Sequence, residues 1–333
     1  MSDRGPPGIR REGTNAEAAN VGLRYVVATR GSRLALAQTD QVIFQLMSSS
    51  PGVSYEVTVI RTKGDKDPRP FFAMDQKGIF EKEVDRAVAD GRADFAVHSL
   101  KDVPSELPGG LVLACVPKRE CPDDVLVTAE GHTLETLPRG AIIGTGSLRR
   151  AVQILRARPD VRVKPIRGNI DTRMSMIGSG TVDGLVLAYA GLARLDVYVR
   201  YVVLPAEEFL PSPGQGALAV ICRAGDAGTL GMLRSIEDPD SRAEADAERA
   251  LSAAVGSGCR FPIGARARCA GGRTSIRADA FSIDGRAVVT AEAEGGTEGP
   301  EAVGRRAGRM LLHRGAGRLA INWRKGLAEW NDR

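Results

Sequence analysis

Residues 25–47, YVVATRGSRLALAQTDQVIFQLM, decide the fold, because an apolar run leads through a short glycine turn into a helix-like segment. The run over 25–29 predicts a strand, and the segment over 32–47 predicts a helix. The same rhythm continues with a strand over 53–61, a helix over 79–90 and a strand over 94–100. Strands that alternate with helices in this way are typical of βαβ units with a parallel sheet.

A second block of the chain repeats this pattern. It predicts strands over 141–144, 161–166 and 184–188, separated by helices over 147–157 and 172–177. Two runs of alternating strands and helices therefore predict two α/β domains.

The character of the chain changes after residues 211–216, PSPGQG. A short apolar strand is predicted over 217–222, and helices are predicted over 241–255 and 301–313. Between the helices, residues 275–294 predict a β-hairpin with Asp284-Gly285 at its turn. This last block predicts a small α+β domain.

The chain has 333 residues, which favours two or three domains, and its 43% hydrophobic and 26% charged residues are typical of a globular protein. Its longest apolar stretches, such as 184–190, are far shorter than the roughly 20 residues that span a bilayer. The N-terminus shows no apolar signal-peptide core, so we expect a cytoplasmic protein without membrane contact. Residues 1–23, rich in Gly, Pro, Arg, Asn and Glu, are predicted to be a disordered tail.

The 46 Lys and Arg residues exceed the 41 Asp and Glu residues by only +5, too little to indicate nucleic-acid binding. Five cysteines without a close C-x-x-C pair and three scattered histidines predict neither a disulfide framework nor a metal site. Several arginines are nevertheless grouped, which predicts either a local anion site or a solvated helix face. They are Arg149, Arg150, Arg156, Arg158, Arg162, Arg167 and Arg173.

The first candidate motif is the segment 96–104, AVHSLKDVP, in which an apolar strand ends in polar residues. Ligands of open α/β sheets lie at the carboxyl ends of the strands, so Lys101 and Asp102 are expected to face a crevice. The alternative is an exposed ion pair in a strand-to-loop turn.

The second candidate motif is the segment 144–150, GTGSLRR, in which a strand passes through small residues into a helix. Ser147 can cap this helix, and the free N–H groups at the helix start attract anions such as carboxylate or phosphate. The segment lacks the Gly-Lys-Ser/Thr ending of a P-loop and is not a dinucleotide-binding turn. A capped helix with surface arginines is the alternative.

Two further segments, 167–173 and 188–194, place Arg167, Arg173 and Arg194 just after predicted strands at the same edge. The planar guanidinium pairs well with carboxylates, so several converging arginines indicate a polyanionic ligand. For Arg194 the alternative is a residue on a helix surface.

The last motif is the segment 256–264, GSGCRFPIG, whose flanking glycines leave the thiol of Cys259 accessible. Neighbouring Arg260 can favour its thiolate form. The other cysteines are expected to be buried apolar residues, except for a loop thiol at Cys121. The expected buried ones are Cys115, Cys222 and Cys269.

Taken together, these motifs resemble the porphobilinogen deaminase, or hydroxymethylbilane synthase, family. The matching segments follow the family's order from about residue 25 to the C-terminus. They are 28–32 with Leu34, Ala35 and Gln38, then 98–104, 144–150, 167–173, 190–192, 213–217 and Gly258-Cys259. The sequence departs from the family at Gly146, where many relatives have serine, and in 68–78, which has fewer glycines than the family's loop over the active site.

The resemblance implies an α/β fold with two periplasmic-binding-protein-like lobes and a small C-terminal α+β domain. The implied first lobe covers 24–118 and 216–237, and the second lobe covers 119–215. A third domain over 238–333 would carry the cofactor cysteine.

The resemblance also implies a transferase of tetrapyrrole, or heme, biosynthesis. Its cofactor would be a dipyrromethane held by a thioether to Cys259, on which four porphobilinogen molecules condense head to tail with loss of ammonia. Hydrolysis would then release hydroxymethylbilane and leave the primer in place. The family implies a monomer whose partner is the small-molecule substrate porphobilinogen.

Porphobilinogen bears an acetate and a propionate, which an arginine-lined cleft neutralises. By resemblance, Asp102 is the catalytic group and stabilises the cationic azafulvene left when ammonia departs. The residues implied to bind the cofactor are Cys259, Lys101, Thr145, Ser147, Arg149 and Arg150. Those implied to bind the substrate are Arg30, Ser32, Gln38, Arg167, Arg173, Arg194 and Gln215, and those implied for a lid loop are Lys77 and Phe80.

Two other classes of protein stay open from the residues. A two-lobed anion-binding receptor or effector-binding domain would use the arginines but would need neither Asp102 nor Cys259. A thiol transferase would use Cys259 with a small substrate, although no histidine partner is evident.

Overall fold

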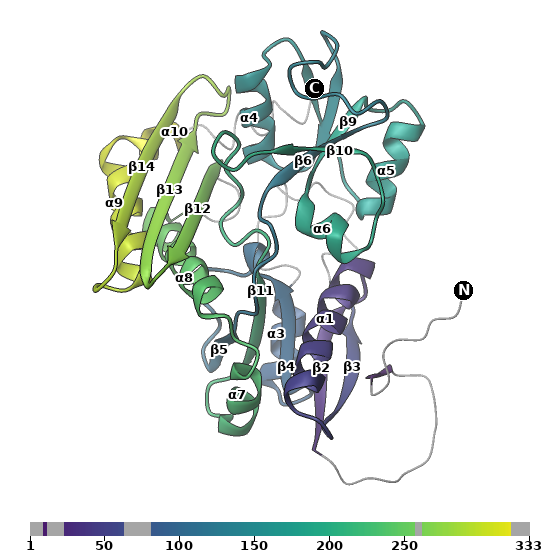
Figure 1. Ribbon diagram of the computed structural model, residues 1–333, viewed down its shortest axis with the longest axis vertical. Helices are drawn as coiled ribbons and strands as arrows, with labels where there is room; N and C mark the ends of the chain where they lie inside the picture. The colour runs from purple at the N-terminus through teal and green to yellow at the C-terminus, as the bar shows by residue number, and fades with distance from the viewer. Residues whose placement is uncertain (1–8, 12–22, 63–80, 257–261, 321–333) are drawn as a thin grey trace. The chain divides into compact units, whose positions relative to one another are not determined.

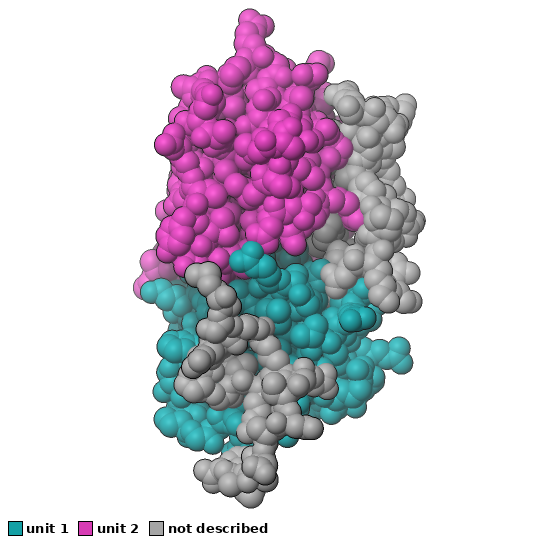
Figure 2. Space-filling view, turned by 90° about the vertical axis from the view of Figure 1, so that its right-hand side faces the viewer, with its two compact units in different colours: residues 1–67, 78–119, 217–242 teal, residues 68–77, 120–216, 243–333 magenta. Residues whose placement is uncertain are grey.

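The computed structural model describes residues 9–11, 23–62, 81–256 and 262–320. The chain divides into two compact units, which Figure 2 colours separately. Unit 1 comprises residues 1–67, 78–119 and 217–242, and unit 2 comprises residues 68–77, 120–216 and 243–333.

Unit 1 contains a six-stranded sheet with the order β1-β3-β2-β4-β11-β5. β1, β3, β2 and β4 run parallel, while β11 runs antiparallel to its neighbours β4 and β5. A strand from late in the chain therefore lies inside this sheet (Figure 1). The strands are β1 (Ile9–Arg11), β2 (Arg24–Arg30), β3 (Ser54–Ile60), β4 (Phe95–Ser99), β5 (Leu111–Cys115) and β11 (Leu218–Arg223).

The helices in the described part of unit 1 are α1 (Arg33–Ser49), α3 (Lys82–Ala89) and α7 (Ala227–Arg234). α1 buries Ala35, Val42 and Leu46, whose spacing places them on one helix face. Val42 and Leu46 belong to one core with buried strand residues such as Val27 and Val57, so the helix is fixed against the sheet.

Unit 2 contains a five-stranded sheet with the order β10-β6-β9-β7-β8. β7 pairs in parallel with β8 and β9, whereas β6 is antiparallel to both β9 and β10. Its strands are β6 (Asp124–Thr128), β7 (Ile142–Thr145), β8 (Arg162–Pro165), β9 (Gly184–Ala188) and β10 (Tyr201–Leu204). The helices that follow its parallel strands are α4 (Leu148–Ala157), α5 (Ile170–Gly178) and α6 (Tyr189–Arg194).

A separate three-stranded antiparallel sheet completes unit 2. Helix α9 covers one face of this sheet, as Figure 1 shows. The last two strands of this sheet form a hairpin that turns at Gly285, which has a positive φ of 71° that favours glycine. The elements are α8 (Pro239–Val255), β12 (Ile263–Ala270), β13 (Arg273–Phe281), β14 (Val288–Gly295), α9 (Pro300–His313) and α10 (Ala316–Ala320).

The α/β fold class is confirmed, but the expectation of parallel sheets was only partly right. β6 and β11 run antiparallel to their neighbours, and β5, β6, β10 and β12 were not predicted. β5, β6 and β10 have only four or five residues each. Short apolar runs resemble loop or helix segments equally well, and strand direction depends on where the chain enters the sheet.

Residues 9–11 form β1 and pair in parallel with β3. Residues 1–8 and 12–22 lie outside the described residues, and the prediction of a disordered tail over 1–23 stays a prediction. The predicted boundaries of the three domains stay a prediction.

Among the described residues, no helix has the length and apolar character that a bilayer crossing needs. The same part of the chain holds no group of His, Cys, Asp and Glu side chains placed to bind a metal ion.

Candidate active site

The first group of predicted residues lies at one edge of the unit 1 sheet. Because β2 and β4 are parallel, Arg30 and Ser99 at their ends lie at the same edge. β4 continues into a short 3₁₀ turn, Leu100–Asp102. This turn leaves Asp102 exposed and Lys101 half-buried, so Asp102 is accessible to a ligand.

Helix α1 brings two more predicted residues to this edge. Ser32 is the N-cap of α1 and accepts a hydrogen bond from the Ala35 N–H at 3.2 Å. Gln38, which is 4% exposed, donates through Nε2 to Ser99 Oγ at 2.7 Å. Gln38 is thus held at the end of β4, beside the turn that carries Asp102.

Three buried titratable groups at the same edge were not assigned a role from the sequence. The His98 Nε2 atom lies 2.9 Å from Asp85 Oδ1, and both side chains are 4% exposed. Glu81 precedes α3, one turn before Asp85. Burial, and then the charge of Asp102, raise the pKa of Glu81 to about 8. The signal in the sequence was the position of both acids on the same predicted helix face as Val84 and Val88.

Asp124 is the centre of the second group, in unit 2. It begins β6 and is fully buried. Its Oδ2 accepts from Arg149 Nη2 at 2.7 Å, and its Oδ1 accepts from Arg150 Nη2 at 2.7 Å and Arg150 Nε at 3.0 Å. Burial raises the pKa of this carboxyl, but the two guanidiniums outweigh burial and lower it to about 2. Asp124 is therefore ionised and holds both arginines; its only sequence signal was an acid beside an apolar run.

The turn between β7 and α4 places these arginines. Thr145 Oγ1 accepts from the Ser147 N–H at 3.1 Å, and Ser147 is the N-cap of α4. Arg149 and Arg150 follow in the first turn of the helix and are 5% and 6% exposed. Thr145 and Ser147 thus shape the helix start that was predicted to attract an anion.

The arginines also bond to main-chain carbonyls. Arg149 Nη1 donates to Leu210 O at 2.6 Å, and Arg150 Nη1 donates to Val186 O at 3.1 Å. Arg149 Nε is buried and has no hydrogen-bond partner among the described residues. An unmet buried donor costs about 1–3 kcal/mol, so a ligand that supplies carboxylate oxygens fits this cluster.

Gln215 belongs to the same buried network. Its Nε2 donates to Asp124 Oδ1 at 2.8 Å and to Pro122 O at 2.6 Å. The preceding Gly214 N–H donates to Glu248 Oε2 at 2.5 Å, and Glu248 Oε1 accepts from the Ala267 N–H at 2.8 Å. Glu248, which sequence reasoning missed, therefore ties α8 and β12 to the segment that carries Gln215.

Arg173 and Arg194 add positive charge to unit 2. Arg173 Nε donates to Gly168 O at 2.9 Å, and Arg194 Nη2 donates to Gly216 O at 2.6 Å. Burial, and then the charges of Arg150 and Arg167, lower the pKa of Arg173 to about 10. Burial likewise lowers the pKa of Arg194 to about 10. These guanidiniums have lost part of their hydration, a condition under which carboxylates bind strongly.

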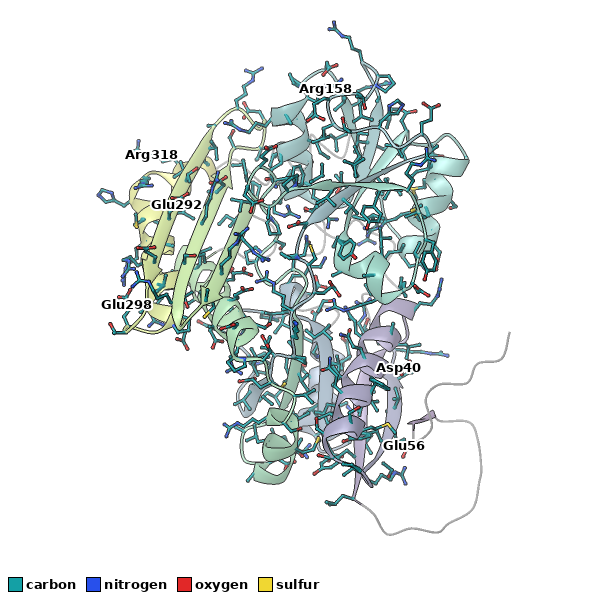
Figure 3. All side chains as sticks on the ribbon, in the orientation of Figure 1. Asp40, Glu56, Arg158, Glu292, Glu298 and Arg318 are labelled. Atoms are coloured by element: carbon teal, nitrogen blue, oxygen red, sulfur yellow. The ribbon has the colours of Figure 1, made fainter. Side chains whose placement is uncertain are left out.

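Other members of the arginine group lie away from this cluster. Arg158, labelled in Figure 3, follows the last turn of α4 and pairs with Asp160 at 2.7 Å. Arg156 and Arg162 are exposed. For Arg156 and Arg162 the prediction of a solvated surface was the better one, whereas Arg158 is half-buried and also donates to Leu137 O at 2.8 Å.

The described cysteines divide by burial. Cys115 and Cys222 are buried as predicted, and burial raises the pKa of their thiols to about 12 and about 11. Cys121 is exposed as predicted, whereas Cys269 is half-buried at the end of β12, so the prediction of full burial was wrong there. Cys259, Lys77 and Phe80 lie outside the described residues.

A family model for the dipyrromethane cofactor binding domain of porphobilinogen deaminase matches residues 25–230. A model for the C-terminal domain of porphobilinogen deaminase matches residues 243–313. Together these matches cover the part of the chain that holds both groups of site residues.

Curated relatives match over nearly their whole length. A probable porphobilinogen deaminase of Nitrosopumilus maritimus is 53% identical over 309 residues, which are 93% of this chain and 99% of the relative. The porphobilinogen deaminase of Desulforudis audaxviator is 45% identical and covers 90% of this chain and 98% of its own length. Among solved structures, the BenM effector binding domain with benzoate covers 64% of this chain and 90% of its own, at 13% identity and a TM-score of 0.39.

Proposed function

This chain belongs to the porphobilinogen deaminase family, and from that premise we propose that its buried arginines bind the carboxylates of porphobilinogen and of the growing pyrrole chain. The enzyme is a transferase of tetrapyrrole biosynthesis with hydroxymethylbilane synthase activity. Porphobilinogen units are joined with loss of ammonia, and hydrolysis releases the linear product.

The observation that carries the proposal is the excess of buried positive charge in unit 2. Asp124 is one carboxylate between two buried arginines, and Arg173 adds a third cation nearby whose pKa is lowered by burial and by Arg150. A buried charge excess of this sign is stabilised by an anion. The acetate and propionate groups of a pyrrole substrate supply such anions.

The cofactor of this family is a dipyrromethane, which would serve as the primer for the condensation of porphobilinogen units. In unit 2, Arg149 and Arg150 would hold its carboxylates, because Arg149 Nε lacks a partner among the described residues. Thr145 and Ser147 would fix the helix start that presents these arginines, and Lys101 of unit 1 is the further cation assigned to the cofactor. Arg167, Arg173 and Arg194 would bind the carboxylates of the substrate.

In unit 1, Asp102 is the proposed catalytic residue. When ammonia leaves the aminomethyl arm of porphobilinogen, the C–N bond electrons leave with nitrogen and the methylene carbon becomes cationic. An exposed carboxylate at the end of β4 can stabilise this positive charge. Arg30, Ser32 and Gln38 surround the same edge and would orient the substrate, while Lys77 and Phe80 are proposed for the lid.

Cys259 is the proposed attachment residue, through a thioether. A thioether is not cleaved by thiol reductants, unlike a disulfide. Protein produced in a host that makes tetrapyrroles should therefore show, after reduction and denaturation, a mass excess of two linked pyrrole units on the peptide that contains Cys259.

The matched control is Cys121, the exposed thiol of the described chain. Cys259→Ala should lack both the mass excess and the activity, whereas Cys121→Ala should keep both. An unmodified mass in fully active protein would overturn the covalent attachment. An unmodified, inactive wild-type protein would instead favour the anion-binding receptor.

We also propose that the protein is a monomer that acts on a small molecule in the cytoplasm and binds neither nucleic acid nor membrane. Its support is the modest net charge of +5 and the family's chemistry. Light scattering on the purified protein should give a mass close to the 35.4 kDa of one chain.

A further inference from the structure

The two sides of strand β4 are paired to different extents. On the β11 side the pairing runs along the whole strand, from Phe95 to Ser99. On the β2 side, among the described residues, it covers only the first two positions, Phe95 and Ala96. The carboxyl half of β4, which leads into the turn with Asp102, therefore takes its sheet pairing from β11.

The place where β2 and β4 separate is also the place where the strand order of the unit 1 sheet reverses. β3 lies on one side of β2, and β4 lies on the other. Right-handed connections then place α1, which follows β2, and α3, which precedes β4, on opposite faces of the sheet, as Figure 1 shows. Ligands of α/β sheets bind at the carboxyl ends of the strands beside such a reversal.

Two side-chain hydrogen bonds, one from each face, hold the carboxyl half of β4. From α3, Asp85 Oδ1 lies 2.9 Å from His98 Nε2, and both side chains are 4% exposed. From α1, Gln38 Nε2 donates to Ser99 Oγ at 2.7 Å. Successive strand residues point to opposite faces, so His98 and Ser99 meet different helices. The last two residues of β4 are thus fixed from both sides of the sheet.

The chain neighbours of Asp85 and His98 are apolar and buried. Val84 and Val88 on α3 and Val97 on β4 are at most 2% exposed. A well-packed apolar pair in place of Asp85 and His98 would be as stable or more stable, because two polar groups would no longer lose their hydration. A hydrogen bond differs from apolar packing because it fixes the distance and direction between two atoms. The polar pair therefore supplies position where an apolar pair would supply stability alone.

The turn that follows β4 carries this position to Asp102. The Leu100 N–H donates to Ala217 O at 3.0 Å, and the Val103 N–H donates to Leu100 O at 3.1 Å. Asp102 lies between these hydrogen bonds, four positions after His98. A shift of the end of β4 along α3 would therefore move Asp102 as well.

We propose that Asp85 and His98 are a positioning pair for Asp102, because their hydrogen bond fixes how far β4 extends toward the carboxyl edge of the sheet. The pair acts through the place of the Asp102 carboxylate and does not itself touch the substrate. The inference rests on the proposed function, since it needs Asp102 to be the catalytic residue.

The first experiment replaces the pair by two apolar side chains in the variant Asp85→Leu/His98→Leu. Its melting temperature should stay near the wild-type value or rise. Its kcat with porphobilinogen, per mole of cofactor-loaded enzyme, should fall about 10- to 100-fold, because a small displacement of a reacting group slows the chemical step. The KM should change less than about threefold. A double variant with the wild-type kcat would overturn the proposal.

A conservative variant separates the hydrogen bond from the bulk of the side chain. Asp85→Asn keeps an oxygen that can accept from His98 Nε2, so its kcat should stay within about threefold of the wild type. Asp85→Leu removes the acceptor and should be slowed like the double variant. Equal kcat values for Asp85→Asn and Asp85→Leu would show that the hydrogen bond does not matter, and would overturn the proposal.

The matched control is Tyr55→Phe, which removes another buried polar contact of the same sheet. Tyr55 is 1% exposed, and its hydroxyl lies 3.7 Å from Met232 Sδ. It is the second residue of β3 and so lies near the amino edge, away from Asp102. Tyr55→Phe should keep the wild-type kcat and KM. If it slows turnover as much as the double variant, the loss comes from any buried polar contact and the proposal is overturned.

The second experiment repeats the double variant in an Asp102→Asn enzyme. A pair that acts through Asp102 has little left to position once that carboxylate is gone, so the residual kcat should fall by less than about twofold. A fall as large as in the wild-type background would indicate a general structural effect and would overturn the proposal. A slow Asp102→Asn enzyme beside a fast double variant would overturn the positioning pair alone. Full turnover in Asp102→Asn would instead overturn the proposed catalytic role, and this inference with it.

Discussion

Asp124 is the residue on which the arrangement of the unit 2 arginines most depends. It is fully buried and accepts hydrogen bonds from Arg149, Arg150 and Gln215. Asp124→Asn should lower the free energy of unfolding by about 3–5 kcal/mol, because two buried guanidiniums lose their counter-charge. Urea unfolding measures this, and Asp160→Asn, which removes the acid paired with Arg158 outside the core, should change stability much less.

The Asp124 carboxylate also predicts how the stability of the protein falls at acid pH. Its pKa is lowered from 3.8 to about 2, so its contribution is complete above about pH 4 and is lost as pH falls through about 2. Unfolding measured from about pH 5 down to pH 2 should show a steeper loss in the wild type than in Asp124→Asn. Curves of equal slope would mean that the ion pair contributes nothing to acid stability.

Asp102 is expected to affect turnover and not folding, because it is exposed on a short turn. Asp102→Asn should keep the melting temperature and lower kcat by about 100-fold or more, as loss of an electrostatic stabiliser does. Glu106→Gln, an exposed acid a few residues later, is the control and should keep full turnover. An Asp102→Asn enzyme within about threefold of the wild type would remove Asp102 from the catalytic role.

Among the elements, helices α8 and α9 approach closely at Gly304. A Cβ atom at this position would lie 2.0 Å from the Ala247 carbonyl oxygen, which is main chain and cannot rotate away. Gly304→Ala should therefore destabilise the protein by about 1–3 kcal/mol through overpacking.

Gly231 in α7 offers the opposite case, since a Cβ there meets nothing within 4 Å. Gly231→Ala should stabilise the protein by about 0.5–1 kcal/mol through helix propensity. Thermal unfolding of both variants checks the pair, and a stabilising Gly304→Ala would contradict the close approach.

For the whole molecule, arginines that lie close together repel one another and lower the stability of the fold. We therefore predict a conflict between stability and activity. Arg173 is partly desolvated beside Arg150 and Arg167, and its pKa is lowered to about 10. Arg173→Leu should leave the melting temperature unchanged or raised while the KM for porphobilinogen rises about tenfold or more, since one charge-assisted pair is lost. The exposed Arg156→Leu should change neither quantity, and a normal KM in Arg173→Leu would place Arg173 outside the binding site.

The sequence by itself determined the alternation of strands and helices and the residues that follow the strand ends. The local pattern correctly placed Ser147 at the start of α4, with Arg149 and Arg150 in its first turn. It also placed Lys101 and Asp102 after the end of β4. These positions could be predicted because helix starts and strand ends are set by neighbours in the chain. The family motifs came from the same short segments.

Only the tertiary structure decided which of these residues serve as internal partners. Gln215 meets Asp124 from 91 positions away, and Arg150 meets it from 26 positions away. The antiparallel course of β6 and β11 was equally beyond local pattern. Hydrophobic periodicity and secondary-structure propensity describe neighbours within a few residues. The buried pairing of an acid with two arginines depends instead on how distant segments pack. The free energy of that pairing arises only once water has been excluded.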